Sequence, residues 1–98
     1  MSGNLHVVAT LHAQAGKEEE LQTLLEGLLE PTRAEDGCVR YQLLRNEADP
    51  SEFTFVEEWV SAEALASHFE TEHIQTTRAK FDGVLAGELD LRRYRLVG

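Results

Sequence analysis

The sequence is short of several features, and each shortage excludes a class of protein. A single cysteine, Cys38, among 98 residues rules out an intrachain disulfide, and a lone thiol fits a reducing cytoplasm. No apolar run is long enough to span a bilayer, and residues 1–4 lack the charged start and apolar stretch of a signal peptide. We therefore expect a cytoplasmic protein that does not associate with membranes.

Basic residues are scarce as well. Nine lysines and arginines stand against 18 aspartates and glutamates, so the formal net charge is −9. That field would repel a phosphate backbone, and nucleic-acid binding is not expected. Much of the acidic excess lies in one segment, and it is interpreted as a solvated helix face. The segment contains Glu18, Glu19, Glu20, Glu26, Glu30, Glu35 and Asp36.

Sequence motifs that hold cofactors are also missing. There is no glycine-rich dinucleotide or P-loop motif, no Cys-x-x-Cys pair and no Gly-x-Ser-x-Gly elbow. What is present, 42% hydrophobic and 28% charged residues, is the composition of an ordinary globular protein. The length predicts one domain over residues 1–98, small enough to gain stability from pairing with a second copy.

Hydrophobic periodicity predicts the order of the elements. Apolar residues alternate with period two over residues 5–13, 38–46, 53–60 and 89–97, which is typical of strands. Leucines at helical spacing predict a helix over residues 17–34 that Pro31 kinks or ends, and a second helical region begins at Ala62 and ends near Gly87. The order β-α-β-β-α-β predicts an α+β, ferredoxin-like domain: a four-stranded antiparallel sheet with helices on one face.

One face of such a sheet stays uncovered. We assign three apolar sets to the helix-facing side: Leu5/Val7/Leu11, Val39/Tyr41/Leu43 and Phe53/Phe55/Trp59. The other face still carries Val8, Thr10, Leu44, Val56, Val60, Tyr94 and Leu96, a set too apolar to be left in water as a contiguous patch. We therefore predict a homodimer packed through this face. The alternative is a monomer with singly scattered apolar residues.

The candidate site lies on the helix-facing side. Trp59 is the only tryptophan, and alternation places it on one face with Glu57 and Tyr41. An interior carboxylate is costly unless it is paired, and His68 and His73 come from the helices that should cover this face. Glu57 with one of these histidines is a natural pair. The alternative is that Glu57 reaches water at the sheet edge and has no chemical role.

The same three residues raise a metal hypothesis. Two histidines and one carboxylate are the usual set at non-haem iron. However, Glu57, His68 and His73 lack a regular helical i, i+4 spacing, and we predict no metal site.

The chain also resembles a known family. It is similar to the antibiotic biosynthesis monooxygenase superfamily, in particular its small bacterial quinol monooxygenase branch, over nearly its whole length. The resemblance rests on the order and spacing of Tyr41, Asp49-Pro50, Phe53, Glu57-Glu58-Trp59, Ala64-Leu65, His68, Thr71 and His73. It implies a dimeric α+β barrel, in which two ferredoxin-like sheets pack face to face.

The resemblance also implies a function. Characterised members oxidise quinols, anthrones or other electron-rich phenols with O₂, without metal, flavin or haem. This implies a cofactor-independent monooxygenase for a small aromatic or enolisable compound, with His68 or His73 as the base and Glu57 as its partner. Trp59, Tyr41 and Phe55 would form the pocket wall. A non-catalytic small-molecule-binding or stress-response dimer and an isomerase of a small carbonyl compound remain alternatives.

Overall fold

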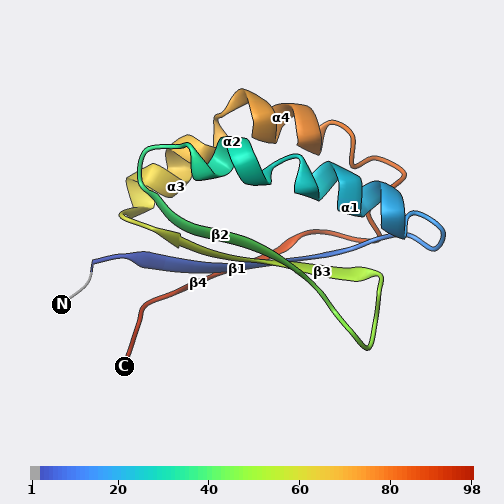
Figure 1. Cartoon of the computed structure of the whole chain (residues 1–98), viewed down its shortest axis with the longest axis horizontal. Helices are drawn as coiled ribbons and strands as arrows, with labels where there is room; N and C mark the ends of the chain where they lie inside the picture. Colours follow the sequence, from blue (N-terminus) through green and yellow to red (C-terminus); the bar gives the residue numbers. More distant parts are fainter. Residues whose placement is uncertain (1–2) are drawn as a thin grey trace.

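The computed structural model describes residues 3–98 and has the predicted α+β architecture, with the helices on one face of a single sheet (Figure 1). Met1 and Ser2, which belong to the segment without signal-peptide features, lie outside the described residues. Among the helices of residues 3–98, none is long and apolar enough to cross a membrane.

The elements follow the predicted order, with each helical region divided in two. They are β1 (Leu5–His12), α1 (Glu18–Glu26), α2 (Leu29–Arg33), β2 (Cys38–Arg45), β3 (Glu52–Trp59), α3 (Ala62–Phe69), α4 (Glu72–Arg78) and β4 (Asp90–Tyr94). The strand order across the sheet is β2-β3-β1-β4, and every neighbouring pair is antiparallel. This is the ferredoxin-like topology that the sequence predicts.

The core lies between the sheet and the helices. Alternate residues of β1 and β3 point into it, because successive strand side chains face opposite sides of a sheet. Leu21, Leu25, Leu65 and Ile74 cover them from the helices, and each is at most 7% exposed. The helix-facing sets predicted for β1 and β3 are therefore confirmed.

Val39 is an exception to the predicted core face. It is 53% exposed. The pairing of β2 with β3 shifts register between Cys38 and Arg40, which is the signature of a β-bulge. Period-two alternation therefore fails at this point of β2. Beyond the bulge, Tyr41 is buried as predicted.

Three boundaries also differ from the prediction. The second helical region ends at Arg78, not near Gly87, and turns connect it to β4. The first helical region is interrupted between Glu26 and Leu29, ahead of Pro31. Pro31 itself lies in the first turn of α2, where the missing N–H is tolerated. β4 ends at Tyr94, which pairs with His6 near the start of β1, so few residues of β1 are left for the chain beyond it to pair with.

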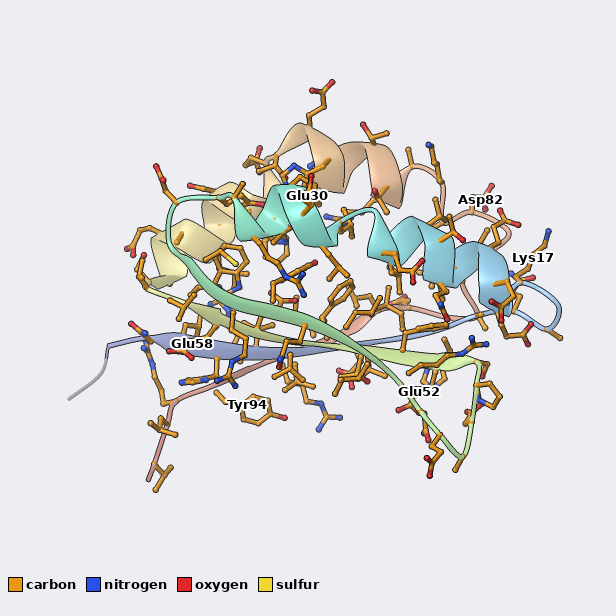
Figure 2. All side chains as sticks on the ribbon, viewed as in Figure 1. Lys17, Glu30, Glu52, Glu58, Asp82 and Tyr94 are labelled. Carbon is orange, nitrogen blue, oxygen red and sulfur yellow. The ribbon has the colours of Figure 1, made fainter. Side chains whose placement is uncertain are left out.

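No helix covers the second face of the sheet (Figure 1). Figure 2 shows Tyr94 projecting from this side, whereas Glu30 points away from the sheet on the outer side of α2. Apolar side chains on this face are partly in water: Leu44 is 53% and Tyr94 45% exposed. Val60, predicted for the same face, lies beyond the end of β3, where its side chain is near Gly37 at the turn that packs on α3. The predicted uncovered apolar face is thus present in the single chain.

Candidate functional site

A cavity of about 290 Å³ lies between the sheet and the helices. Its wall is mainly apolar: Ala9, Leu11, Leu25, Leu28, Phe55, Phe69, Ile74, Phe81, Leu89 and Leu91. Five polar or ionisable residues complete it: Tyr41, Glu57, His68, Thr77 and Arg78. An apolar cavity with a few polar groups is the usual composition of a small-molecule site.

α3 brings His68 to this cavity. Ser61 caps the helix by accepting a hydrogen bond from the backbone N–H of Ala64, at 3.1 Å. His68 follows Leu65 by three positions, so both lie on the buried side of the helix. The His68 side chain is 3% exposed, and its ring packs against Trp59 with 4.7 Å between ring centroids.

His68 is held by a carboxylate. Its Nδ1 lies 2.7 Å from Oε2 of Glu35, and Nε2 of His73 lies 2.6 Å from the same oxygen. A carboxylate only accepts hydrogen bonds, so each of these nitrogens carries the hydrogen and donates it. The bond therefore fixes the His68 tautomer and leaves Nε2 as the nitrogen with a free lone pair. Within residues 3–98, Nε2 of His68 has no hydrogen-bond partner.

The surroundings keep His68 neutral. Burial lowers the pKa of His68, while the hydrogen bond from Nδ1 to Glu35 and the charge of Glu35 act in the opposite direction. A neutral imidazole with an unprotonated nitrogen beside an apolar cavity has the properties of a general base at neutral pH.

Glu57 is the second ionisable group of the cavity. It is 4% exposed, and its Oε1 accepts a hydrogen bond of 2.9 Å from Nε1 of Trp59, two residues along β3 on the same face. Burial raises the pKa of Glu57 to about 7; the Trp59 hydrogen bond opposes this rise and the charge of Glu35 adds to it. A carboxyl group in this state exchanges a proton near neutral pH.

The carboxylate that pairs with the two histidines therefore differs from the one predicted. Glu35, not Glu57, pairs with His68 and His73. Glu57 bonds Trp59 on its own strand, whereas the turn before β2 carries Glu35 to α3. Gly37 makes this approach possible: it has φ +88°, and a Cβ there would lie 2.7 Å from Cβ of Ala64.

Glu35 is the residue that sequence reasoning missed. It belongs to the acidic segment interpreted as a solvated face, yet its side chain is only 13% exposed. The Asp36-Gly37 turn was a signal that the chain reverses there. Nothing local in the sequence indicates that the turn packs on α3.

The other predicted residues divide into two groups. Tyr41, Phe55, Glu57 and His68 line the cavity, as the pocket hypothesis requires. Trp59 lies behind the wall, fully buried. His73 lies on the outer side of Glu35 with a side chain that is 23% exposed. Neither Trp59 nor His73 lines the cavity.

Metal donors come together at two places in the described part of the chain. Donor atoms of Glu35, His68 and His73 lie within 4.8 Å of one another, as do those of His12, Asp49 and Glu52. The first set has the two-histidine, one-carboxylate composition known from non-haem iron. Since Glu35 and His73 do not line the cavity, an ion held there would lie behind His68, outside the cavity wall.

The chain is thus an α+β protein with a ferredoxin-like sheet, a small apolar cavity under its helices and a histidine–carboxylate pair at the cavity wall. The model of the family described as antibiotic biosynthesis monooxygenase matches residues 4–80. The chain belongs to this family.

Individual relatives are similar to the chain over most of its length. YcnE of Bacillus subtilis, which carries a provisional monooxygenase name, is 31% identical over 90% of this chain and 93% of its own length. An uncharacterized Synechocystis protein is 29% identical over 92% of this chain, but the match spans only 61% of that longer protein. The crystal structure of PA3566 from Pseudomonas aeruginosa superposes with a TM-score of 0.92 at 34% identity, covering 99% of this chain and 98% of that one.

Proposed function

We propose that the protein is a cofactor-independent monooxygenase that oxidises a small quinol, anthrone or other electron-rich aromatic or enolisable compound with O₂. The observation that carries the proposal is the 2.7 Å contact between Nδ1 of His68 and Oε2 of Glu35, which leaves Nε2 as the basic nitrogen of a histidine that lines an apolar cavity. Membership of the antibiotic biosynthesis monooxygenase family supports the reaction class.

The base acts first in this scheme. Nε2 of His68 accepts the acidic proton of the substrate, and the imidazolium that forms is stabilised by Oε2 of Glu35 through the 2.7 Å bond at Nδ1. His73 bonds the same oxygen at 2.6 Å and is partly exposed, so it offers a route by which protons exchange with solvent. Its role is that of a positioning residue for Glu35.

The substrate anion then supplies the electrons. For an anthrone-type methylene, the anion gives one electron to O₂, and the resulting radical and superoxide combine as a peroxide. His68 returns its proton to the peroxide, and the O–O bond breaks as the remaining hydrogen of that carbon leaves. One oxygen atom stays in the product as a carbonyl and the other leaves as water.

The cavity wall favours the anion over competing reactions. Tyr41 and Phe55 stack with 4.7 Å between ring centroids and line the cavity, where they exclude water from the substrate. Burial, with the charge of Glu57 added, raises the pKa of Tyr41 and keeps its phenol neutral. Glu57, protonated below about pH 7, donates a hydrogen bond to a substrate oxygen.

A homodimer completes the proposal. The uncovered sheet face exposes Leu44 and Tyr94, and packing it against a second copy would remove these side chains from water. Sedimentation at micromolar concentration should give twice the 11.0 kDa chain mass. V56R should weaken the dimer, because it buries an unpaired charge; a monomeric wild type would contradict the proposal.

The lone, partly buried Cys38 supports a reducing, cytoplasmic setting.

An isomerase of a small carbonyl compound is the second candidate. A neutral histidine and a carboxyl group with a pKa of about 7 in one cavity would also suit proton transfer between two carbons of a substrate. The two reactions differ in whether O₂ is consumed. A purely ligand-binding protein would do neither.

An oxygen-electrode screen of quinols and anthrones with chelator-treated protein tests the proposal. We expect O₂ uptake equal to product formed, unaffected by the chelator. Conversion of an enolisable substrate without O₂ uptake would favour the isomerase. Activity that is lost with chelator and restored by iron would overturn the cofactor-independent scheme.

A further inference from the structure

The cavity has one basic residue with a permanent charge in its wall, Arg78. This residue is the last of α4 and is exposed to solvent. Within residues 3–98 its guanidinium has no hydrogen bond or ion pair. Arg33 donates to the carbonyl of Tyr41, Arg45 pairs with Glu19, and Arg92 pairs with Asp90. Arg40 and Arg93 resemble Arg78 in having no such partner among residues 3–98, but neither lines this cavity.

Arg78 lies on the side of α4 that lines the cavity. Ile74 precedes it by four positions and also lines the cavity, so the two residues share one face of α4. Thr77, the neighbour of Arg78, lines the cavity as well. Arg78 therefore lies at the edge of the cavity-lining side of α4, where it is also exposed to solvent.

The ionisable groups of the cavity differ in depth. His68 is 2% and Glu57 4% exposed, whereas Arg78 is in contact with solvent. Because both residues line one cavity of about 290 Å³, a ligand that presents its acidic proton to His68 can place a substituent at Arg78. The surroundings make this charge significant, because a net charge of −9 otherwise repels anions.

We propose that Arg78 binds a carboxylate substituent of the ligand, so that the substrates of this cavity are aromatic acids. The planar guanidinium matches a carboxylate with two parallel hydrogen bonds, whereas a neutral ring gains nothing from it. The substrate class rests on the proposed function. Binding of a carboxylate by Arg78 does not, because it depends only on the cavity and its charge.

Calorimetric titration without O₂ tests this inference separately from turnover. The probes are 6-hydroxy-2-naphthoic acid and its neutral carboxamide. The wild type should bind the acid more tightly than the amide. R78Q should weaken binding of the acid about tenfold, the usual worth of a charge-assisted pair, and leave the amide unchanged. R78K keeps the charge but not the two parallel hydrogen bonds of the guanidinium, so its affinity for the acid should lie between those of wild type and R78Q.

K80Q is the matched control. Lys80 is exposed, two residues further along, and does not line the cavity, so its loss should leave both affinities unchanged. An acid that binds no better than the amide, or not at all, would overturn the inference. So would R78Q weakening both probes equally, or K80Q acting like R78Q. Activity without this selectivity would leave the proposed function standing, and selectivity without activity would leave the binding site standing.

Discussion

The turn before β2 and the C-terminal part of β3 each hold one largely buried carboxyl group, and the two groups have different surroundings. Glu35 accepts hydrogen bonds from two imidazoles. Glu57 accepts one from a neutral indole, and burial raises its pKa to about 7. Burial and hydrogen-bond partners together distinguish the two groups: in the proposed scheme Glu35 orients His68, whereas Glu57 takes up a proton near pH 7.

The largest effect should come from the base that Glu35 orients. H68Q should lower turnover of a confirmed substrate about 10²–10⁴-fold, the usual worth of general-base catalysis. H73Q should lower it less, because His73 acts only through Glu35. H12Q, which alters a histidine bonded to Glu52 outside the cavity wall, is the control and should keep wild-type turnover. Full turnover in H68Q would show that the substrate ionises without this base.

Glu57 should make the free energy of unfolding depend on pH. Its pKa is raised in the folded state, so the folded protein binds the extra proton between about pH 4.5 and pH 7, and the free energy of unfolding falls as pH rises through that window. The difference in free energy of unfolding between E57Q and wild type should therefore move by about 2 kcal/mol in favour of E57Q from pH 5.5 to pH 8. Urea unfolding at the two pH values measures it.

The control for E57Q is its neighbour on the other face of β3. Glu58 accepts a hydrogen bond from Asn4 and does not line the cavity, so E58Q should change stability by the same amount at both pH values. His68 titrates with the opposite sign: its pKa is lowered, and its contribution to stability is lost as pH falls below about 6.5. A pH-independent effect of E57Q would mean that Glu57 is ionised throughout.

E35Q should have a smaller effect on rate, about tenfold, because an amide still accepts from Nδ1 but no longer stabilises the imidazolium. The hydrogen bond and charge of Glu35 hold the pKa of His68 above the value that burial alone would set. Removing them should move the acid limb of the kcat/KM profile to lower pH, and E35D should restore it in part. An unshifted profile would show that Glu35 only supports the fold.

The sequence predicts most of what depends on periodicity. The buried faces of β1 and β3, and the presence of Tyr41, Phe55, Glu57 and His68 in one cavity, follow from alternation and from the helices that must cover it. The bulge that exposes Val39 and the approach that pairs Glu35 with His68 do not follow, because each is created by a contact between distant segments.

The central claim is that His68 presents an unprotonated Nε2 to the cavity because Glu35 holds the hydrogen on Nδ1. Two-bond ¹H–¹⁵N NMR of the imidazole side chains at neutral pH tests it without a substrate. We predict one protonated nitrogen, Nδ1, and one unprotonated nitrogen, Nε2, for His68, with this preference weakened in E35Q. A hydrogen on Nε2 of wild-type His68, or a doubly protonated ring, would contradict the account.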